Sequence, residues 1–204
     1  MIPVEAHQPE PAMFDAKVRQ KGLAHLHKKG IALNQPLPTG TQIEPYWSAC
    51  LDDLYTSYHG TCAYLAVFFE RCTGTGSVDH FVAKSQQAGL AYEWSNFRLA
   101  CMAMNTKKNR YDDVLDPFTL KEGWFHLELL TGRVFPNPEL PPTYRSQVQA
   151  TIDRLELNDS KNKRMRTQHY DGYIDFSYTS KYLQKKSPFV WLEAHRQGLL
   201  REAV

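Results

Sequence analysis

The sequence predicts an α+β protein built around a short strand–loop–strand–helix segment, with further helices before and after it. Three observations predict this class. A short apolar strand precedes the pair Asp79-His80, and a second strand begins at Asn96. Apolar residues recur at helical spacing between Phe14 and Lys29. Residues 124–135 alternate between apolar and polar side chains, which is typical of a hairpin packed on a core.

Length and composition allow one compact domain. The chain has 204 residues, of which 42% are hydrophobic and 12% aromatic, enough for one core with appended helices. Within it we expect an N-terminal arm and helix (1–44), a central core (45–120) and a C-terminal hairpin and helical region (121–204). Because the net charge is only +2, any surface for nucleic acid must come from local basic patches.

The N-terminus and the cysteines indicate the compartment. The first residues lack a basic region followed by an apolar run, and the longest apolar stretch, 63–69, is too short to cross a bilayer. We therefore expect a cytoplasmic protein without membrane association. The chain contains 4 cysteines and no export signal, so we expect reduced thiols rather than a disulfide framework.

The N-terminal part is expected to supply an arm, two supporting helices and a connecting loop. Residues 1–12 contain three prolines and read as an extended arm. Gly30 is placed to end the helix that starts near Phe14. Residues 34–45 contain three prolines and a glycine, which predicts a surface loop. The next helix should be capped by Ser48 and stopped by Gly60.

The remaining elements flank the central segment. Residues 62–69 read as a buried strand or a knuckle, and residues 73–76 as a turn that leads into the first strand. After the hairpin, residues 144–155 have one apolar helix face, and a charged run follows at 161–166. Ser187-Pro188 should begin a C-terminal helix, with proline in the first turn.

Four polar residues of the central segment suit phosphodiester hydrolysis with one metal ion. A carboxylate such as Asp79 and an amide oxygen such as Asn105 suit Mg²⁺, or another divalent cation such as Mn²⁺. His80 can act as the general base on the attacking water. Asn96 lies far enough along the chain to reach back and orient the imidazole through a hydrogen bond.

Basic residues near this segment are candidates for contacts with phosphate. Lys84 and Lys108 could contact the phosphates that flank the cleaved bond, and Lys107 belongs to the same Asn-Thr-Lys-Lys run. Arg164 and Arg166, in the later charged run, are candidates for a contact with the phosphate backbone. A solvated helix surface explains the charged run equally well.

These residues carry a resemblance to a nuclease family. Asp79-His80, Asn96 and Asn105-x-x-Lys108 are similar to the His-Asn-His (HNH) motif of the ββα-metal nuclease fold. The flanking pieces resemble the HNH subunit of Septu-type antiphage systems, PtuB-like, including copies encoded beside retrons. These pieces are Cys62-Ala-Tyr, VDHF with Lys84-Ser85, AYEWSN, LAC and Leu115-Asp116-Pro117. The match covers residues 45–120, and TIDRLELN at 151–158 also fits.

The resemblance implies an HNH endonuclease that acts in antiviral defence together with a PtuA-like ATPase. It also allows association with a retron reverse transcriptase and its msDNA. The ATPase must be another chain, because no phosphate-binding P-loop motif occurs here. DNA is the default substrate, since an imidazole-activated water needs no 2′-hydroxyl, and RNA, including tRNA, stays open.

The chain departs from the family at two positions. Related proteins carry two Cys-x-x-Cys pairs suited to a structural zinc, whereas Leu65 and Met104 replace one cysteine of each pair here. We therefore expect no structural zinc, with Leu65 packed against Met104. The alternative is a zinc site made of Cys62, Cys72 and Cys101 and completed by a histidine.

Two other classes of function remain possible from the sequence. The first is a scaffold subunit with a vestigial site, which docks on the ATPase and holds nucleic acid without cutting it. The second is a transcription regulator, but no helix-turn-helix signature supports it. The presence of Asp79, His80 and Asn105 together favours the enzyme.

Overall fold

The computed structural model describes residues 1–4, 9–73 and 76–201. The described residues form seven α-helices and two small antiparallel sheets, which confirms the predicted α+β class. The chain divides into two compact units. The β1–β2 unit comprises residues 7–60 and 70–112, and the β3–β4 unit comprises residues 1–6, 61–69 and 113–204.

The β1–β2 unit begins with two helical segments. A π-helical turn, Asp15–Arg19, runs directly into α1, Gln20–Lys28. A 3-10 turn, Tyr46–Cys50, runs into α2, Leu51–Ser57. The predicted helix after Phe14 is confirmed: Phe14, Val18 and Leu26 are buried along one face.

Gly30 ends the first helix in the predicted way. Its φ of +65° lies in the left-handed region, which glycine adopts without a steric penalty. The amide of Ile31 then donates a hydrogen bond to the carbonyl of Leu26 at 3.0 Å, so a helix-end carbonyl is satisfied by the chain that leaves the helix.

Ser48 does not cap the second helix, so that expectation was wrong. Its hydroxyl donates to the carbonyl of Pro45 at 2.7 Å, within the 3-10 turn. In such a turn, residue i lies over residue i+3, and the hydroxyl therefore meets a carbonyl rather than a free amide. Gly60, with a φ of +69°, follows the helix as predicted.

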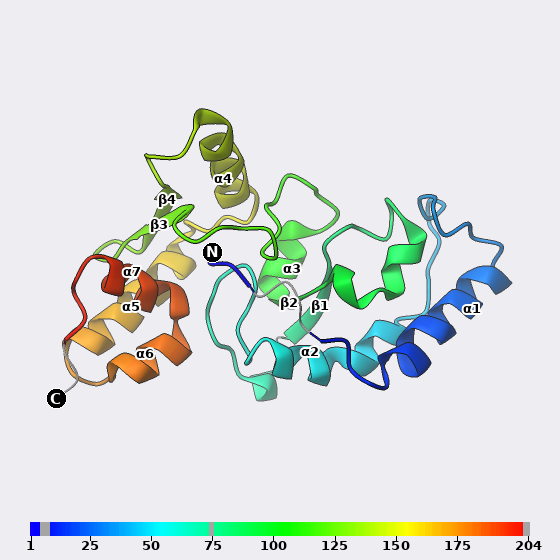
Figure 1. Ribbon diagram of the computed structural model, residues 1–204, viewed down its shortest axis with the longest axis horizontal. Coiled ribbons are helices and arrows are strands. Elements are labelled where there is room, and N and C mark those ends of the chain that lie inside the picture. The colour runs from blue at the N-terminus through cyan, green and yellow to red at the C-terminus, as the bar shows by residue number, and fades with distance from the viewer. Residues whose placement is uncertain (5–8, 74–75, 202–204) are drawn as a thin grey trace. The chain divides into compact units, whose positions relative to one another are not determined.

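The centre of this unit is a strand–loop–strand–helix segment (Figure 1). Strand β1, Gly76–His80, pairs antiparallel with β2, Phe97–Cys101, and His80 lies opposite Phe97. The loop between them contains two 3-10 turns, Ala88–Tyr92 and Trp94–Asn96. Helix α3, Met102–Lys108, follows β2 without a linker and contacts both strands.

The β3–β4 unit contains the predicted hairpin. Strand β3, Phe125–Glu128, pairs antiparallel with β4, Arg133–Pro136. The helices of this unit are α4 (Pro142–Arg154), α5 (Ser160–Ile174), α6 (Ser180–Lys186) and α7 (Pro188–Arg196). Helices α4 and α7 agree with the predicted ones, and Pro188 occupies the first turn of α7. Ser187 precedes that turn without a side-chain capping hydrogen bond.

Residues 61–69 form a tight turn rather than a strand. An isolated bridge joins Thr61 and Phe68, and the amide of Ala66 donates to the carbonyl of Cys62 at 2.8 Å. Ala66 has a φ of +50°. Of the two predicted alternatives, the structure therefore has the knuckle.

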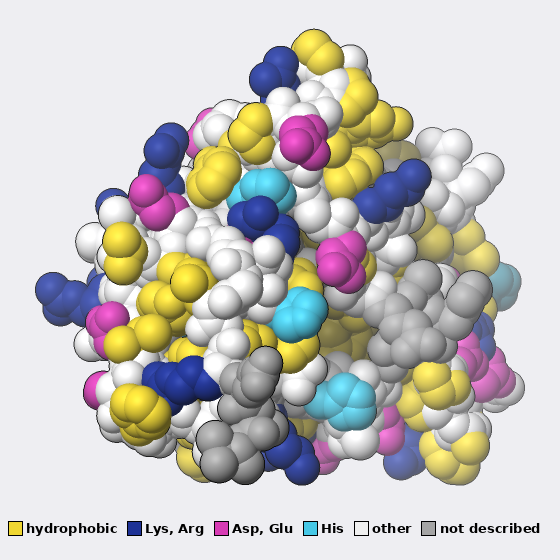
Figure 2. All heavy atoms as spheres, turned by 60° about the vertical axis from the view of Figure 1, so that its left-hand side comes forward, with side chains coloured by type: hydrophobic (Ala, Val, Ile, Leu, Met, Phe, Trp, Pro, Cys, Tyr) yellow, Lys and Arg dark blue, Asp and Glu magenta, His cyan; other side chains and the backbone are white. Residues whose placement is uncertain are grey.

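The surface carries charges of both signs. On the face shown in Figure 2, Lys and Arg side chains are spread among acidic, apolar and neutral ones. This distribution agrees with the net charge of +2, and a basic patch is not evident on that face. Among the described helices, none has both the length and the apolar composition needed to span a bilayer.

Candidate active site

The β1–β2 unit contains a cavity of about 890 Å³ beside the end of β1. Asp79, His80, Lys84 and Asn105 all line it. The first two come from β1, Lys84 from the loop after it, and Asn105 from α3. The fold thus brings four of the predicted site residues to one cavity.

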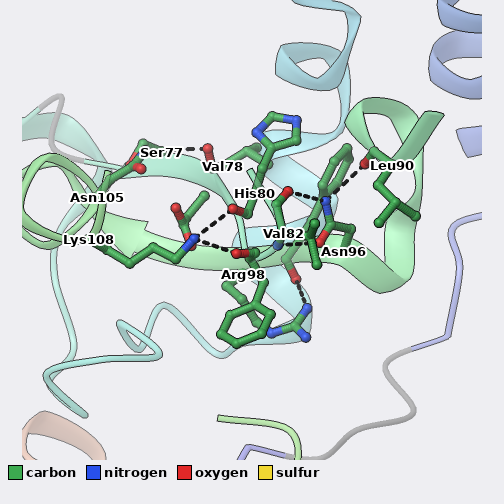
Figure 3. A network of polar contacts seen from close by, with 12 residues as sticks. Ser77, Val78, His80, Val82, Leu90, Asn96, Arg98, Asn105 and Lys108 are labelled. Atoms are coloured by element: carbon green, nitrogen blue, oxygen red, sulfur yellow. Dashed lines mark hydrogen bonds and ion pairs between the residues drawn. The ribbon is translucent and has the colours of Figure 1, made fainter. Parts of the chain in front are cut away.

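Asp79 lies at the floor of the cavity and faces a buried lysine. Its side chain is only 2% exposed, and its Oδ2 lies 3.6 Å from the Nζ of Lys108. Alternate residues of a strand point to opposite faces, so Asp79 and His80 leave β1 on different sides. Figure 3 shows the His80 imidazole directed away from the Lys108 ammonium.

Lys108 is fully buried, which does not suit the predicted contact with substrate phosphate. Its ammonium donates to the carbonyls of His80 at 2.8 Å and of Phe81 at 2.6 Å. A buried charge needs such partners, since an unpaired ammonium away from water is costly. Lys108 therefore ties α3 to the end of β1 and places a positive charge beside Asp79.

His80 is buried in an aromatic setting. The ring packs edge-on against Trp47, with centroids 4.7 Å apart, and against Phe97 at 5.1 Å. Its Nε2 lies 2.9 Å from the carbonyl oxygen of Ala91. Since a carbonyl can only accept, Nε2 carries the proton and Nδ1 is the atom able to accept one. Burial, reinforced by the charge of Lys84, lowers the pKa of His80 to about 3, so the ring is neutral at pH 7.

Asn96 fixes the loop around His80 rather than the imidazole itself. Its Oδ1 accepts from the amide of Val82 at 2.8 Å, and its Nδ2 donates to the carbonyls of Val82 and Leu90, both at 3.0 Å. The predicted hydrogen bond to the ring is made by the Ala91 carbonyl instead. Asn96 therefore orients His80 through the loop that contains Ala91.

Asn105 points its amide nitrogen at β1. Its Nδ2 donates to the hydroxyl of Ser77 at 3.1 Å and to the carbonyl of Val78 at 3.3 Å. Because the nitrogen is engaged, the oxygen is the atom left for a cation in the cavity. One carboxylate and one amide oxygen fit Mg²⁺, which keeps several waters.

Lys84 of the same cavity lies beside Trp47. Its Nζ lies 4.3 Å from the ring centroid of Trp47, a cation–π contact. Burial lowers the pKa of Lys84, and the nearby Asp79 acts in the opposite direction. Lys84 lines the cavity, and its contact with phosphate stays a prediction.

The other predicted basic contacts lie elsewhere. Lys107 is half-buried on α3, and Arg164 is exposed on α5. Arg166 is buried, and its guanidinium donates to the carbonyls of Gly132 at 3.0 Å and Leu157 at 2.7 Å. These bonds suit a structural role in the β3–β4 unit better than the predicted phosphate contact.

The residues relevant to zinc are divided between the two units. Cys62 and Leu65 belong to the β3–β4 unit, while Cys72, Cys101 and Met104 belong to the β1–β2 unit. Within the described part of the chain, no group of three or more His, Cys, Asp and Glu side chains is placed to hold a metal ion. The expected Leu65–Met104 contact and the expected absence of zinc stay predictions.

Sequence reasoning missed two features of the site. Trp47 packs against both His80 and Lys84, and residues 36–41 form one wall of the cavity. Neither is near the motif in sequence. Only the proline content of the 34–45 loop, which restricts its backbone, was visible beforehand.

Comparison with models of known protein families gave no match for this chain. Comparison with curated protein sequences gave no match either.

Proposed function

We propose that this protein is a metal-dependent endonuclease of the HNH type, which hydrolyses phosphodiester bonds of nucleic acid. The observation that supports this most is the meeting of Asp79, His80 and Asn105 at one cavity. Asp79 and His80 lie on β1 and Asn105 on α3, in a segment of two antiparallel strands followed by a helix, which is the order of elements in the ββα-metal fold that the motif resembles.

In this proposal each side chain has a different role in hydrolysis. Neutral His80, held through Nε2, can accept a proton from water at Nδ1. Asp79 and Asn105, which line the same cavity as His80, would hold the divalent cation, Mg²⁺ or Mn²⁺. The bound ion would stabilise negative charge on the phosphate and on the leaving oxygen. Lys84 adds a positive charge at the same cavity.

The biological setting that we propose follows from the resemblance to PtuB-like subunits. The nuclease would act in antiviral defence in the cytoplasm, with a PtuA-like ATPase as partner, and in retron-associated copies with the reverse transcriptase and msDNA. The exposed Arg164 remains a candidate contact for nucleic acid in such a complex.

A scaffold without activity is the second candidate, and one observation favours it. Asp79 is nearly inaccessible and already faces the ammonium of Lys108 at 3.6 Å. A carboxylate held in this way is a poorer ligand for a cation than a free one, because the ammonium competes for it.

The deciding experiment is a cleavage assay with the purified chain, alone and with its ATPase partner. Labelled DNA and RNA are incubated with Mg²⁺ or with a chelator. We expect cleavage that needs the metal and is lost in Asp79→Asn, a change that keeps the shape and removes the charge. No cleavage by the wild type under any condition would favour the scaffold. Equal cleavage by Asp79→Asn would show that the activity does not depend on this carboxylate and would overturn the proposed site.

A further inference from the structure

The cavity at Asp79 has an apolar side as well as a catalytic floor. We propose that this side receives the base of an unpaired nucleotide, so that the substrate is single-stranded nucleic acid. This inference rests on the proposed endonuclease function and names the substrate class of the same site.

The apolar side comes from two elements. Pro36, Leu37 and Pro38 form one part of the wall, and Met102, in the first turn of α3, forms another. Met102 is 51% exposed. Apolar surface left exposed at the edge of a polar site indicates a contact that forms on binding. A methionine thioether adapts well to the flat face of an aromatic ring.

The wall is fixed in place by hydrogen bonds on both sides of residues 36–41. The residues before the wall are held by two backbone amides of the 3-10 turn Ala88–Tyr92. The Gly89 amide donates to the carbonyl of Leu33 at 2.8 Å, and the Ala88 amide donates to the carbonyl of Gln35 at 2.9 Å. The residues after the wall are held by two side chains. The Lys29 ammonium donates to the backbone carbonyl of Gln42 at 3.1 Å, and the Tyr92 hydroxyl donates to the backbone carbonyl of Glu44 at 2.8 Å.

These hydrogen bonds restrict the conformations open to residues 36–41. Pro36 and Pro38 further restrict the backbone of this segment, because the proline ring fixes φ. A substrate therefore meets a preformed wall, and binding does not have to order a loop.

An unpaired nucleotide fits these walls better than a duplex does. A duplex offers a protein its phosphates, its sugars and the mostly polar edges of its bases, while stacking covers the ring faces. An unpaired base offers its whole face to apolar and aromatic side chains.

The burial of Asp79 and His80 also favours an unpaired nucleotide over a duplex. Asp79 is 2% exposed and His80 7% exposed, so a phosphate must enter the recess to reach them. The volume of about 890 Å³ lies within the range of small-molecule pockets and suits a nucleotide rather than a helix of stacked pairs.

The first test compares substrates of one sequence: single-stranded DNA, single-stranded RNA, duplex DNA and a hairpin with an unpaired loop, each with Mg²⁺. We expect unpaired DNA or RNA to be cut at least ~10-fold faster than the duplex, and the hairpin to be cut in its loop, on the scale of base stacking. Duplex cleavage at an equal or higher rate, abolished by Asp79→Asn, would overturn the single-strand proposal and leave the nuclease standing. Cleavage of no substrate would overturn both.

The second test removes the apolar side. Leu37→Ser and Met102→Ser should each raise KM for the single strand about 5- to 100-fold with little change in kcat, because the phosphate chemistry is untouched. Leu130→Ser is the matched control: Leu130 is 86% exposed and lies outside the cavity lining. Unchanged KM in both cavity variants, with thermal unfolding like that of the wild type, would contradict the proposal.

Discussion

At the scale of single residues, His80 and Asn105 should respond differently to truncation. His80→Ala should leave metal and nucleic-acid binding nearly intact and slow cleavage by roughly 100-fold or more, because the proton acceptor is lost while the proposed cation ligands Asp79 and Asn105 remain. Asn105→Ala should weaken the apparent affinity for Mg²⁺, so that a higher metal concentration partly restores the rate. Single-turnover cleavage across a Mg²⁺ titration measures both effects.

The control for the His80 variant is His27→Ala, since His27 is exposed on α1 in the same unit. It should cleave like the wild type. Full cleavage by His80→Ala would show that this imidazole is not the base, and a rate of Asn105→Ala that ignores metal concentration would remove Asn105 from the cation site.

The buried pair of Asp79 and Lys108 supports a second prediction at this scale. Lys108→Met removes the ammonium and leaves a nearly inaccessible carboxylate without that partner. We expect a loss of about 3 kcal/mol in the free energy of unfolding, as for other broken buried pairs. Added Mg²⁺ should restore part of this stability, because the cation replaces the lost charge beside Asp79.

Urea unfolding with and without Mg²⁺ measures this, with Lys28→Met as the control on the exposed part of α1. A merely structural lysine would give the same loss of stability without any rescue by metal. Stability equal to that of the wild type would show that the pair contributes nothing to the fold.

The sequence predicted which residues meet at the cavity better than it predicted what each one does. Asp79, His80 and Asn105 carry a motif spacing, and the structure places them together. The motif says nothing about burial, however, and Lys108 is inside because its ammonium finds two carbonyls at the end of β1. Asn96 likewise bonds the loop backbone, where the amide and carbonyl of Val82 offer it both a donor and an acceptor.

At the scale of elements, helix α1 depends on the absence of a side chain at Gly22. A Cβ there would lie 2.1 Å from Cγ of Tyr92, whose ring is fully buried. Gly22→Ala should therefore destabilise the fold, because overpacking costs roughly 1–3 kcal/mol. This outweighs the gain of about 1 kcal/mol in helix propensity.

Thermal unfolding followed by circular dichroism tests this, with Lys21→Ala as the control at the neighbouring exposed position. We expect a lower melting temperature for Gly22→Ala alone. A melting temperature at or above that of the wild type would mean that α1 and Tyr92 do not pack as closely as described.

Elements were predictable where local chemistry decides them. Gly30 ends α1 by its own left-handed geometry, and Pro188 begins α7 by its fixed φ. Helix α6 was not predicted, because its only strong local signal is Thr179, which caps it by accepting from the amide of Tyr182 at 3.1 Å. The wall at residues 36–41 has no regular structure, so hydrophobic periodicity could not place it at the site.

At the scale of the whole molecule, each unit contains a histidine whose pKa is strongly lowered by burial. Burial lowers the pKa of His80 to about 3 in the β1–β2 unit. Burial and the charge of Lys186 lower the pKa of His169 to about 4 in the β3–β4 unit. The Nδ1 atom of His169 has no hydrogen-bond partner among the described residues.

Both shifts make the fold sensitive to acid. In the unfolded chain these histidines take up a proton near pH 6.5, while the folded chain resists doing so until pH 3–4. Between these values the unfolded state binds more protons, so stability is complete above pH 6.5 and falls as the pH is lowered. The slope is at most about 1.4 kcal/mol per pH unit for each histidine.

Urea unfolding at pH 7.5 and pH 5 should therefore show a marked loss of stability at the lower pH, and His169→Gln should lose less than the wild type, since glutamine does not titrate. His27→Gln, at an exposed position, should keep the slope of the wild type. An identical slope in His169→Gln and the wild type would mean that His169 is solvated in the folded protein, and the acid response would then have to come from His80 and His126, whose pKa burial also lowers.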